Sequence, residues 1–283
     1  MILVTSAAGN TGRVLVKKLV EAGLDVLAAD INPKVNELPG IKKAMVGDLT
    51  DLSYIDALME EATMVVHIPP LFSAQEALIG QRMVDKAIQH KIQHFVFISV
   101  THPILTSLLQ HTAKRDVEEY LIYKGMEKQC SYTILQPMHY MHNFNPKMVG
   151  ETGEYQIFYD VDSKISYVAT EDVGEVVVKV LTDPAKHNKA TYELVGTEAY
   201  SPKELVQTFN QITGKNATAV YIEVEEFLDQ IHATDLYFRE GFKQLAYSYS
   251  TWGLDGNTNV LGWLLGHEPT SFTDYVKKKM NED

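Results

Sequence analysis

The 283-residue chain contains little cysteine and no long apolar run, and each absence excludes a class of protein. The single cysteine, Cys130, cannot form an intramolecular disulfide, and one thiol cannot build a zinc site or a thiol relay. No run of about 18 apolar residues is available to cross a bilayer. The opening residues MILVTSAAG lack the basic region of a signal peptide and are typical of a strand. We therefore expect a cytoplasmic protein that does not contact a membrane.

Positive charge is also scarce, because the formal net charge is −12 and the pI is about 5.3. Such a chain repels nucleic acid, and its one dense cationic run, residues 277–279, is typical of a solvated helix face. No paired histidine or carboxylate spacing falls on one helix face, so we expect no metal site. The predicted partner is a small-molecule substrate or a regulated protein, and we expect a monomer or a homodimer.

Residues 1–135 repeat one pattern, in which a short β-branched run, a turn and a helix-period segment follow one another. This pattern predicts βαβ units and therefore a Rossmann-type, doubly wound parallel sheet. The predicted strands are residues 2–5, 25–30, 44–46, 64–68, 94–99 and 132–135. Residues 13–22 and 75–91 carry their apolar side chains at helical spacing and are predicted crossover helices.

The pattern loosens after Pro137. Residues 139–159 show no clear period, and we expect them to form a loop wall over a pocket. Further on we predict a helix over 170–181, a strand over 192–195, a helix from Ser201 to Gly214, and mostly helical structure through Tyr275. The expected division is a dinucleotide-binding domain of residues 1–135 with 166–196, and a smaller, mainly helical substrate or partner lobe of 136–165 and 197–283.

A glycine-rich turn follows the first predicted strand and precedes the first helix. Gly9 and Gly12 would let the backbone approach a pyrophosphate, whose charge favours the positive end of the following helix. Ser6 stands where the usual pattern has its first glycine, and serine fits there if the backbone needs no positive φ. The alternative is a tight turn whose glycines serve packing alone. The predicted nucleotide contacts in this turn are Ser6, Ala8, Gly9, Asn10, Thr11 and Gly12.

The second predicted strand ends at Asp30, at the place of the acidic residue that accepts the ribose hydroxyls of the adenosine. A carboxylate there would repel the 2′-phosphate of NADP, so NAD is the favoured cofactor. Arg13 could meet that phosphate, which keeps NADP as an alternative, and Asp30 could instead merely form the turn. We place Asp48, Leu49 and Pro69 in the same cofactor site.

The chain resembles the NmrA-like proteins, atypical members of the short-chain dehydrogenase/reductase superfamily. The resemblance extends over nearly the full length and rests on AAGNTGR (7–13), GDLTD (47–51), HFVFISV (94–100), KRDVEEYL (114–121), YTILQP (132–137), YVATEDVGEV (167–176), TYELVG (191–196) and LGHEPTSFTDYV (265–276). It implies the Rossmann-type fold and a nicotinamide nucleotide.

The resemblance also implies catalytic positions. Catalytic short-chain enzymes use serine, tyrosine and lysine, and Ser99 and Lys114 match the serine and the lysine, which also holds the nicotinamide ribose. The tyrosine would stand at position 110, which is Gln110, and an amide cannot act as a general acid. Gln136 is a second departure, because the family usually has arginine before Pro137.

Other residues could supply the missing acid. A literal YxxxK occurs at Tyr120 and Lys124, but it leaves too little chain before Pro137, and Tyr120 falls within a periodic helix. Tyr140 is the preferred substitute, and four histidines are alternatives that could equally be surface or wall residues: His102, His111, His139 and His142.

Two functions therefore stay open. The first is an NAD(P)H-dependent oxidoreductase that reduces a quinone-like or other electrophilic small molecule, with Lys114 or water supplying the proton. The second is a non-catalytic redox sensor that binds the nucleotide and regulates a partner protein, as the loss of the acid predicts.

Overall fold

The computed structural model describes residues 1–282, and the chain forms two compact units. The first unit comprises residues 1–105, 110–137 and 170–192, and the second comprises 106–109, 138–169 and the chain from residue 193 onward. The divisions predicted from the sequence, after residues 135, 165 and 196, lie within four residues of these.

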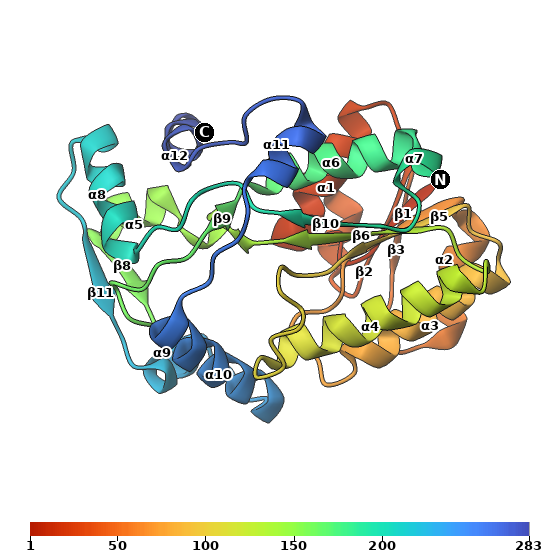
Figure 1. The fold of residues 1–283 in the computed structure, drawn as a ribbon, viewed down its shortest axis with the longest axis horizontal. Helices are drawn as coiled ribbons and strands as arrows, with labels where there is room; N and C mark the ends of the chain where they lie inside the picture. Colours follow the sequence, from red (N-terminus) through yellow and green to blue (C-terminus); the bar gives the residue numbers. More distant parts are fainter. Residues whose placement is uncertain (283) are drawn as a thin grey trace. The chain divides into compact units, whose positions relative to one another are not determined.

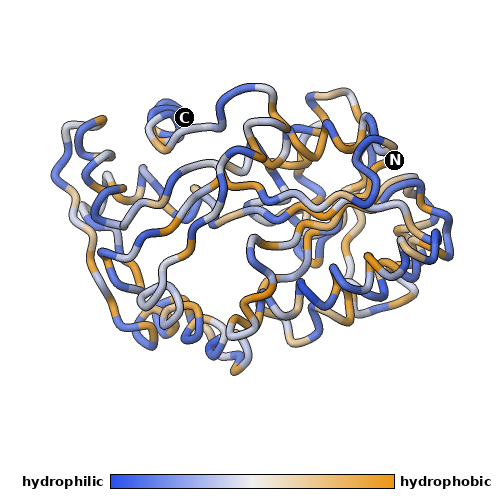
Figure 2. The backbone as a smooth tube through the Cα atoms, viewed as in Figure 1, coloured by the Kyte–Doolittle hydropathy of each residue, from blue (hydrophilic) through white to orange (hydrophobic). Residues whose placement is uncertain are grey.

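The first unit is built on a parallel sheet (Figure 1), in which the described strands follow the order β10-β6-β5-β4-β1-β2-β3. The β-branched and aromatic residues of β1, β2, β4, β5 and β6 are buried, as is typical of strands covered by helices on both sides, whereas the edge strands β3 and β10 are partly exposed. Figure 2 shows these strands as largely apolar. The bounds are β1 (Ile2–Val4), β2 (Val26–Asp30), β3 (Lys43–Val46), β4 (Met64–His67), β5 (His94–Ile98), β6 (Tyr132–Pro137) and β10 (Ala190–Leu194). The predicted Rossmann-type sheet is confirmed.

Helices cover both faces of this sheet (Figure 1). One face carries α1 (Asn10–Glu21), α6 (Thr170–Thr182) and α7 (Pro184–His187), and the other carries α2 (Leu52–Glu61), α3 (Glu76–Gln89) and α4 (Leu109–Met126). A short helix, η1 (Pro33–Glu37), follows β2. The apolar sides of α2, α3 and α4 form one cluster with the strands, and Gly80 allows the Val117 side chain to approach α3 closely.

The second unit combines helices with two small parallel sheets. One sheet joins β8 (Glu154–Ile157) to β11 (Thr218–Tyr221), and the other joins β7 (His139–Tyr140) to β9 (Tyr167–Val168). The helices are η2 (Met141–Asn143), α5 (Pro146–Thr152), α8 (Pro202–Thr213), α9 (Val224–Gln230), α10 (Leu236–Trp252), α11 (Asn259–Leu265) and α12 (Phe272–Asn281). Phe144 packs its ring against Tyr155, Phe209 and Phe272.

The prediction of a loop wall over residues 139–159 is wrong, because this segment contains β7, α5 and β8. Local signals explain the helix. The Asn145 side chain accepts the N–H groups of Lys147 and Met148, Pro146 occupies the first helical position, and Gly153 ends the helix with φ +74°. A seven-residue helix is too short to show a hydrophobic period.

Candidate functional site

The site lies where the strand order of the first unit reverses, between β1 and β4. Ligands of open α/β sheets bind at the carboxyl ends of the strands at such a switch point. Here the turn after β1 is tied to the end of β4. The Thr5 hydroxyl accepts the Ile68 N–H at 2.9 Å, and the Thr5 and Ser6 hydroxyls donate to the Ile68 carbonyl at 3.0 and 2.9 Å.

Gly12 is required by the packing of α1 against this turn. A Cβ on Gly12 would stand 2.2 Å from the Ser6 carbonyl oxygen and 2.7 Å from the Ala7 Cα, and both are backbone atoms. A Cβ on Gly9 would lie 3.3 Å from the same oxygen, which needs only a small shift. The alternative role of the glycines, in packing, therefore applies to Gly12, and Gly9 leaves space above the helix terminus.

Ser6 does not meet the condition under which serine was expected to fit this position, because its backbone has a positive φ. Its φ is +49°, in the left-handed region where a side chain costs free energy and glycine does not. The serine hydroxyl compensates by donating to Ile68, as described above. The turn therefore keeps the backbone shape of the glycine pattern with a serine at its first position.

The N-terminus of α1 fits an anion. No side chain caps the helix, its first turn contains no acidic residue, and Gly9 stands at the N-cap. The N–H groups of residues 10–12 precede the first residue that can find a carbonyl acceptor inside the helix, since the Arg13 N–H bonds to Gly9. These amides and the helix dipole suit one phosphate group of a dinucleotide.

Asp30 binds the backbone of the glycine-rich turn directly. Its Oδ2 accepts the Ala8 N–H at 2.8 Å, and its Oδ1 accepts the Asn32 N–H at 2.8 Å. The carboxylate therefore does form the turn, which was one of the two roles considered. Each carboxylate oxygen keeps a further lone pair, so the same group can still accept a ribose hydroxyl.

A cavity of about 210 Å³ opens beside Asp30 in the first unit. This volume suits the adenosine portion of a dinucleotide rather than the whole molecule. Its lining includes four residues predicted from the sequence, Ser6, Asp30, Asp48 and Leu49. Pro69 is buried and does not line it, whereas the next residue, Pro70, does. Residues missed from the sequence are Ala29, Ile31, Gly47, Thr50, Tyr54, Pro70, Ser73 and Ile79.

Tyr54 forms one wall of this cavity and was missed because it lies inside α2. Its ring packs against Gly47, where a Cβ would stand 2.5 Å from the ring, and its hydroxyl donates to the Met45 carbonyl at 2.7 Å. Burial, followed by the nearby charge of Asp30, raises the pKa of Tyr54 to about 12, so the phenol stays neutral. The glycine of GDLTD was the available signal, because it leaves room for a ring.

Lys114 forms a buried ion pair that the sequence did not predict. Its Nζ lies 2.5 Å from Oε1 of Glu76, at the start of α3, and the two side chains are 9% and 1% exposed. Burial raises the pKa of Glu76, and the Lys114 ammonium opposes this rise. The second carboxylate oxygen of Glu76 is buried without a hydrogen-bond partner.

Ser99 binds a second buried carboxyl group, that of Glu118, which lies on α4 with Lys114. Its hydroxyl donates to Oε1 of Glu118, and Nε2 of Gln136 donates to both oxygens of Glu118 at 2.9 and 3.0 Å. Burial raises the pKa of Glu118, and these hydrogen bonds oppose the rise. Gln136, the position where the family usually has arginine, therefore leaves this carboxyl group with amide and hydroxyl donors in place of a cation.

Comparison with known proteins identifies the family. The model of the NmrA-like family matches residues 1–279. The chain belongs to the NmrA-like family. An agroclavine dehydrogenase from Claviceps fusiformis is 24% identical over 298 residues, which cover 99% of this chain and 97% of that protein.

Two solved structures show the same fold as this NmrA-like chain. A quinone oxidoreductase from Escherichia coli in complex with NADPH matches with a TM-score of 0.77 and 20% identity, covering 99% of this chain and 100% of that chain. NmrA, a negative transcriptional regulator, in complex with NADP, matches with a TM-score of 0.78 and 18% identity, covering 98% and 94%. At these identities the likeness establishes the fold.

The alternative YxxxK pair of this NmrA-like chain occupies the far half of α4. The helix starts near the carboxyl end of β5 and returns toward the start of β6, so residues late in it lie toward the amino ends of the strands, away from the cofactor turn. Tyr120 donates to Asp85 on α3 at 2.5 Å, and the Lys124 ammonium lies 5.3 Å from the Tyr120 ring centroid. Both groups serve helix packing there.

The four histidines considered as acids divide between the two units. His102 and His111 belong to the first, where Nδ1 of His111 lies 2.9 Å from the His102 carbonyl oxygen, and burial lowers the pKa of His111 to about 4. His139 and His142 belong to the second unit with Tyr140, whose ring stacks on His142. Burial lowers the pKa of His139 to about 4. Neither His111 nor His139 is therefore protonated near neutral pH.

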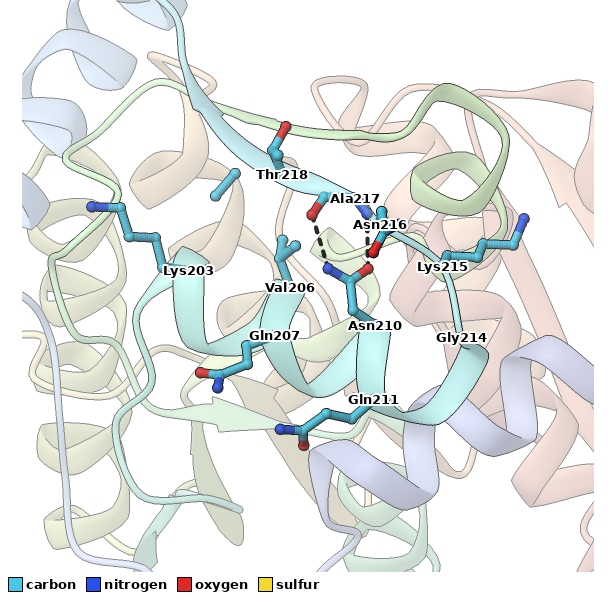
Figure 3. A pocket seen from close by; sticks show the side chains of 11 residues that line it. Lys203, Val206, Gln207, Asn210, Gln211, Gly214, Lys215, Asn216, Ala217 and Thr218 are labelled. Atoms are coloured by element: carbon cyan, nitrogen blue, oxygen red, sulfur yellow. Dashed lines mark hydrogen bonds between the residues drawn. The ribbon is translucent and has the colours of Figure 1, made fainter.

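A larger groove, of about 750 Å³, lies in the second unit between α8 and β11 (Figure 3). Its two lysines and Asn210 are already engaged. Asn210 exchanges two hydrogen bonds with the Ala217 backbone, Lys203 pairs with Asp162 at 2.7 Å, and Lys215 donates to the Gly150 carbonyl at 2.5 Å. The groove therefore presents neither lysine free to bind a ligand, and we place the candidate site at the smaller cavity.

Two further classes of site are absent from residues 1–282. No three His, Cys, Asp or Glu side chains in this range gather closely enough to hold a metal ion. None of the helices in this range combines the length and the apolar character needed to cross a membrane.

Proposed function

We propose that this NmrA-like chain is an NAD(P)H-dependent oxidoreductase that reduces a quinone-like or other electrophilic small molecule. The observation that carries the proposal is the buried Lys114 ammonium on α4, in the same unit as a glycine-rich turn suited to a dinucleotide. The two relatives described above, a dehydrogenase and a quinone oxidoreductase, support a redox reaction.

NAD is the proposed cofactor, with NADP as the alternative. The Asp30 carboxylate lines the cavity suited to adenosine and would stand close to a 2′-phosphate. The carboxylate and the 2′-phosphate are both negatively charged and would repel each other there. The two solved neighbours described above bind NADPH or NADP, and this supports a nicotinamide dinucleotide without favouring either form here.

Residues of this chain can complete the reduction without a tyrosine. A bound dihydronicotinamide supplies a hydride, which carries two electrons to the electrophile and leaves an oxyanion on a quinone. The Lys114 ammonium is the proposed donor of the balancing proton: its N–H bond breaks, an O–H bond forms on the substrate, and the lysine amine recovers a proton from water. Gln110 cannot provide this proton, because an amide is no general acid at neutral pH.

Turnover with NADH tests the proposal. Protein is mixed with excess NADH and a panel of quinones, and the loss of nicotinamide absorbance is followed. We expect consumption of many equivalents of NADH per protein, and we expect Lys114→Ala to weaken NADH binding and turnover together. Lys124→Ala is the matched control, because it removes the lysine of the alternative pair and should leave both properties unchanged. Equal effects of the two substitutions on NADH binding and turnover would contradict the assignment of Lys114 to the site.

A redox sensor is the second candidate function. The observation that favours it is Gln110, which stands where the catalytic acid of the superfamily would be. The fold is also that of NmrA, which is described as a negative transcriptional regulator. Nucleotide binding in calorimetry without turnover of any quinone would support the sensor and contradict the enzyme.

A further inference from the structure

We infer that Glu76 is a positioning residue for Lys114, and that its buried carboxylate keeps the lysine in the ammonium form that can give a proton to the reduced substrate. The inference rests on the proposed function, because it assigns the control of the same proton. It concerns a residue that the glycine-rich turn, the cavity and the superfamily pattern all leave without a role.

The geometry of the pair supports this role. Glu76 is the first residue of α3, where a carboxylate is favoured by the helix dipole, and its Oε1 lies 2.5 Å from Nζ of Lys114. Both side chains are at least nine-tenths buried, so solvent screens the pair little. The Lys114 ammonium is therefore fixed in direction by one strong, charge-assisted hydrogen bond.

The other polar groups around Lys114 do not share this task. From β4, His67 faces the lysine as a neutral ring, because burial and the lysine charge lower its pKa to about 3. From α4, His111 is neutral as well, and Gln110 carries no charge. Glu118, one turn further along α4, is bound by Ser99 and Gln136. Glu76 is thus the carboxylate that neutralises the ammonium.

Stability alone is a poor reason for this pair. Buried ion pairs are often no more stabilising than apolar side chains of the same size, because both charges lose their hydration. This pair carries an additional cost, since Oε2 of Glu76 is buried without a hydrogen-bond partner. An expensive polar pair on the helix that carries the proposed proton donor is better explained by control of that proton.

The pH dependence of turnover separates a positioning role from a structural one. In Glu76→Gln the ammonium would remain buried without a counter-ion, and burial favours the neutral amine. We expect the alkaline limb of kcat/KM for NADH-dependent quinone reduction to move down by about one pH unit or more, which is a tenfold loss at a pH on that limb. Glu76→Asp, which keeps the charge, should move the limb less and in the same direction.

The control is Asp56→Asn, which removes the carboxylate from another partly buried lysine pair of the first unit, that with Lys86 at 2.7 Å. Its alkaline limb should match that of the unmodified protein. An unmoved limb in Glu76→Gln, or an equal loss of rate at every pH, would overturn the inference. If Glu76→Gln fails to fold, the limb of Glu76→Asp decides in the same way.

A second measurement keeps the inference independent of the proposed function. Nitrogen-15 NMR of labelled lysine detects buried ammonium groups, and the Lys114 signal is assigned by its loss in Lys114→Arg. We expect this signal to persist to higher pH in the unmodified protein than in Glu76→Gln. Equal persistence would overturn the role of Glu76, whereas a difference without quinone turnover would refute only the proposed function.

Discussion

Replacing Gly12 with alanine probes the fit between α1 and the turn that precedes it. The new Cβ would stand 2.2 Å from the Ser6 carbonyl oxygen and within 2.8 Å of two Ala7 backbone atoms. These contacts are all with backbone atoms, so the helix and the turn must move apart. Overpacking of this kind costs about 1–3 kcal/mol, and contact with backbone alone places Gly12→Ala near the upper end, at about 3 kcal/mol.

Gly9→Ala is the matched comparison. Its Cβ would lie 3.3 Å from the same oxygen, and Gly9 makes no side-chain cap that alanine would lose. We expect the free energy of unfolding in urea to fall by less than about 1 kcal/mol. The methyl group would nevertheless occupy the space where a diphosphate approaches, so NADH affinity in calorimetry should fall at least about tenfold, or 1.4 kcal/mol.

The two variants together refute or support the reasoning. Gly12→Ala should lose both stability and affinity, and Gly9→Ala should lose mainly affinity. If the free energy of unfolding of Gly12→Ala lies within about 0.5 kcal/mol of that of the unmodified protein, the turn is not packed as described. If Gly9→Ala binds NADH normally, the diphosphate does not lie at the N-terminus of α1.

Two more predictions concern carboxyl groups of the first unit. Asp30→Ala should narrow the preference for NAD over NADP in calorimetry, and Asp30→Asn should narrow it equally while disturbing the turn less; an unchanged ratio of the two affinities would remove Asp30 from the cofactor site. Burial raises the pKa of Glu118, so the folded protein binds a proton on this carboxyl group more tightly than the unfolded chain does. The contribution of Glu118 to the free energy of unfolding therefore falls as the pH rises above the usual glutamate pKa of about 4.3. As the pH rises from acidic to neutral, the free energy of unfolding of Glu118→Gln should therefore increase relative to that of the unmodified protein, as measured by urea unfolding at several pH values. A difference between the two proteins that does not change with pH would contradict the raised pKa.

The sheet and the cofactor turn were predictable because local rules determine them. Short β-branched runs alternating with helical periods predict a parallel sheet, and every end of the observed strands of this sheet lies within two residues of the predicted one. Gly12 stands at a spacing set by the turn, and Asp30 ends the second strand of the same βαβ unit. In contrast, α5 and β8 of the second unit are too short to show a period, and only the capping and turn residues beside them indicate where they lie.

Side-chain partners from distant parts of the chain were not predictable in the same way. Glu76 contacts a lysine that lies 38 residues further along the chain. No local pattern encodes this contact. Ser6 shows a different limit, since its positive φ contradicts the usual preference of serine and is set by the turn around it.

The polar residues of the buried helix faces nevertheless have a signal in the sequence. In α3, Glu76 precedes the buried positions Ile79, Gly80 and Met83 at helical spacing, so periodicity alone places it on the face toward the sheet.

In α4, Gln110, Lys114 and Glu118 recur every four residues on the face that also buries Val117 and Leu121. Charged side chains on such a face lose their hydration and persist only with a partner or a function. Helical register with apolar residues therefore marks both Glu76 and Glu118 as buried carboxyl groups. Because a buried ammonium needs a counter-ion, the same register makes a carboxylate the expected partner of Lys114, although it does not say which of the two glutamates provides it.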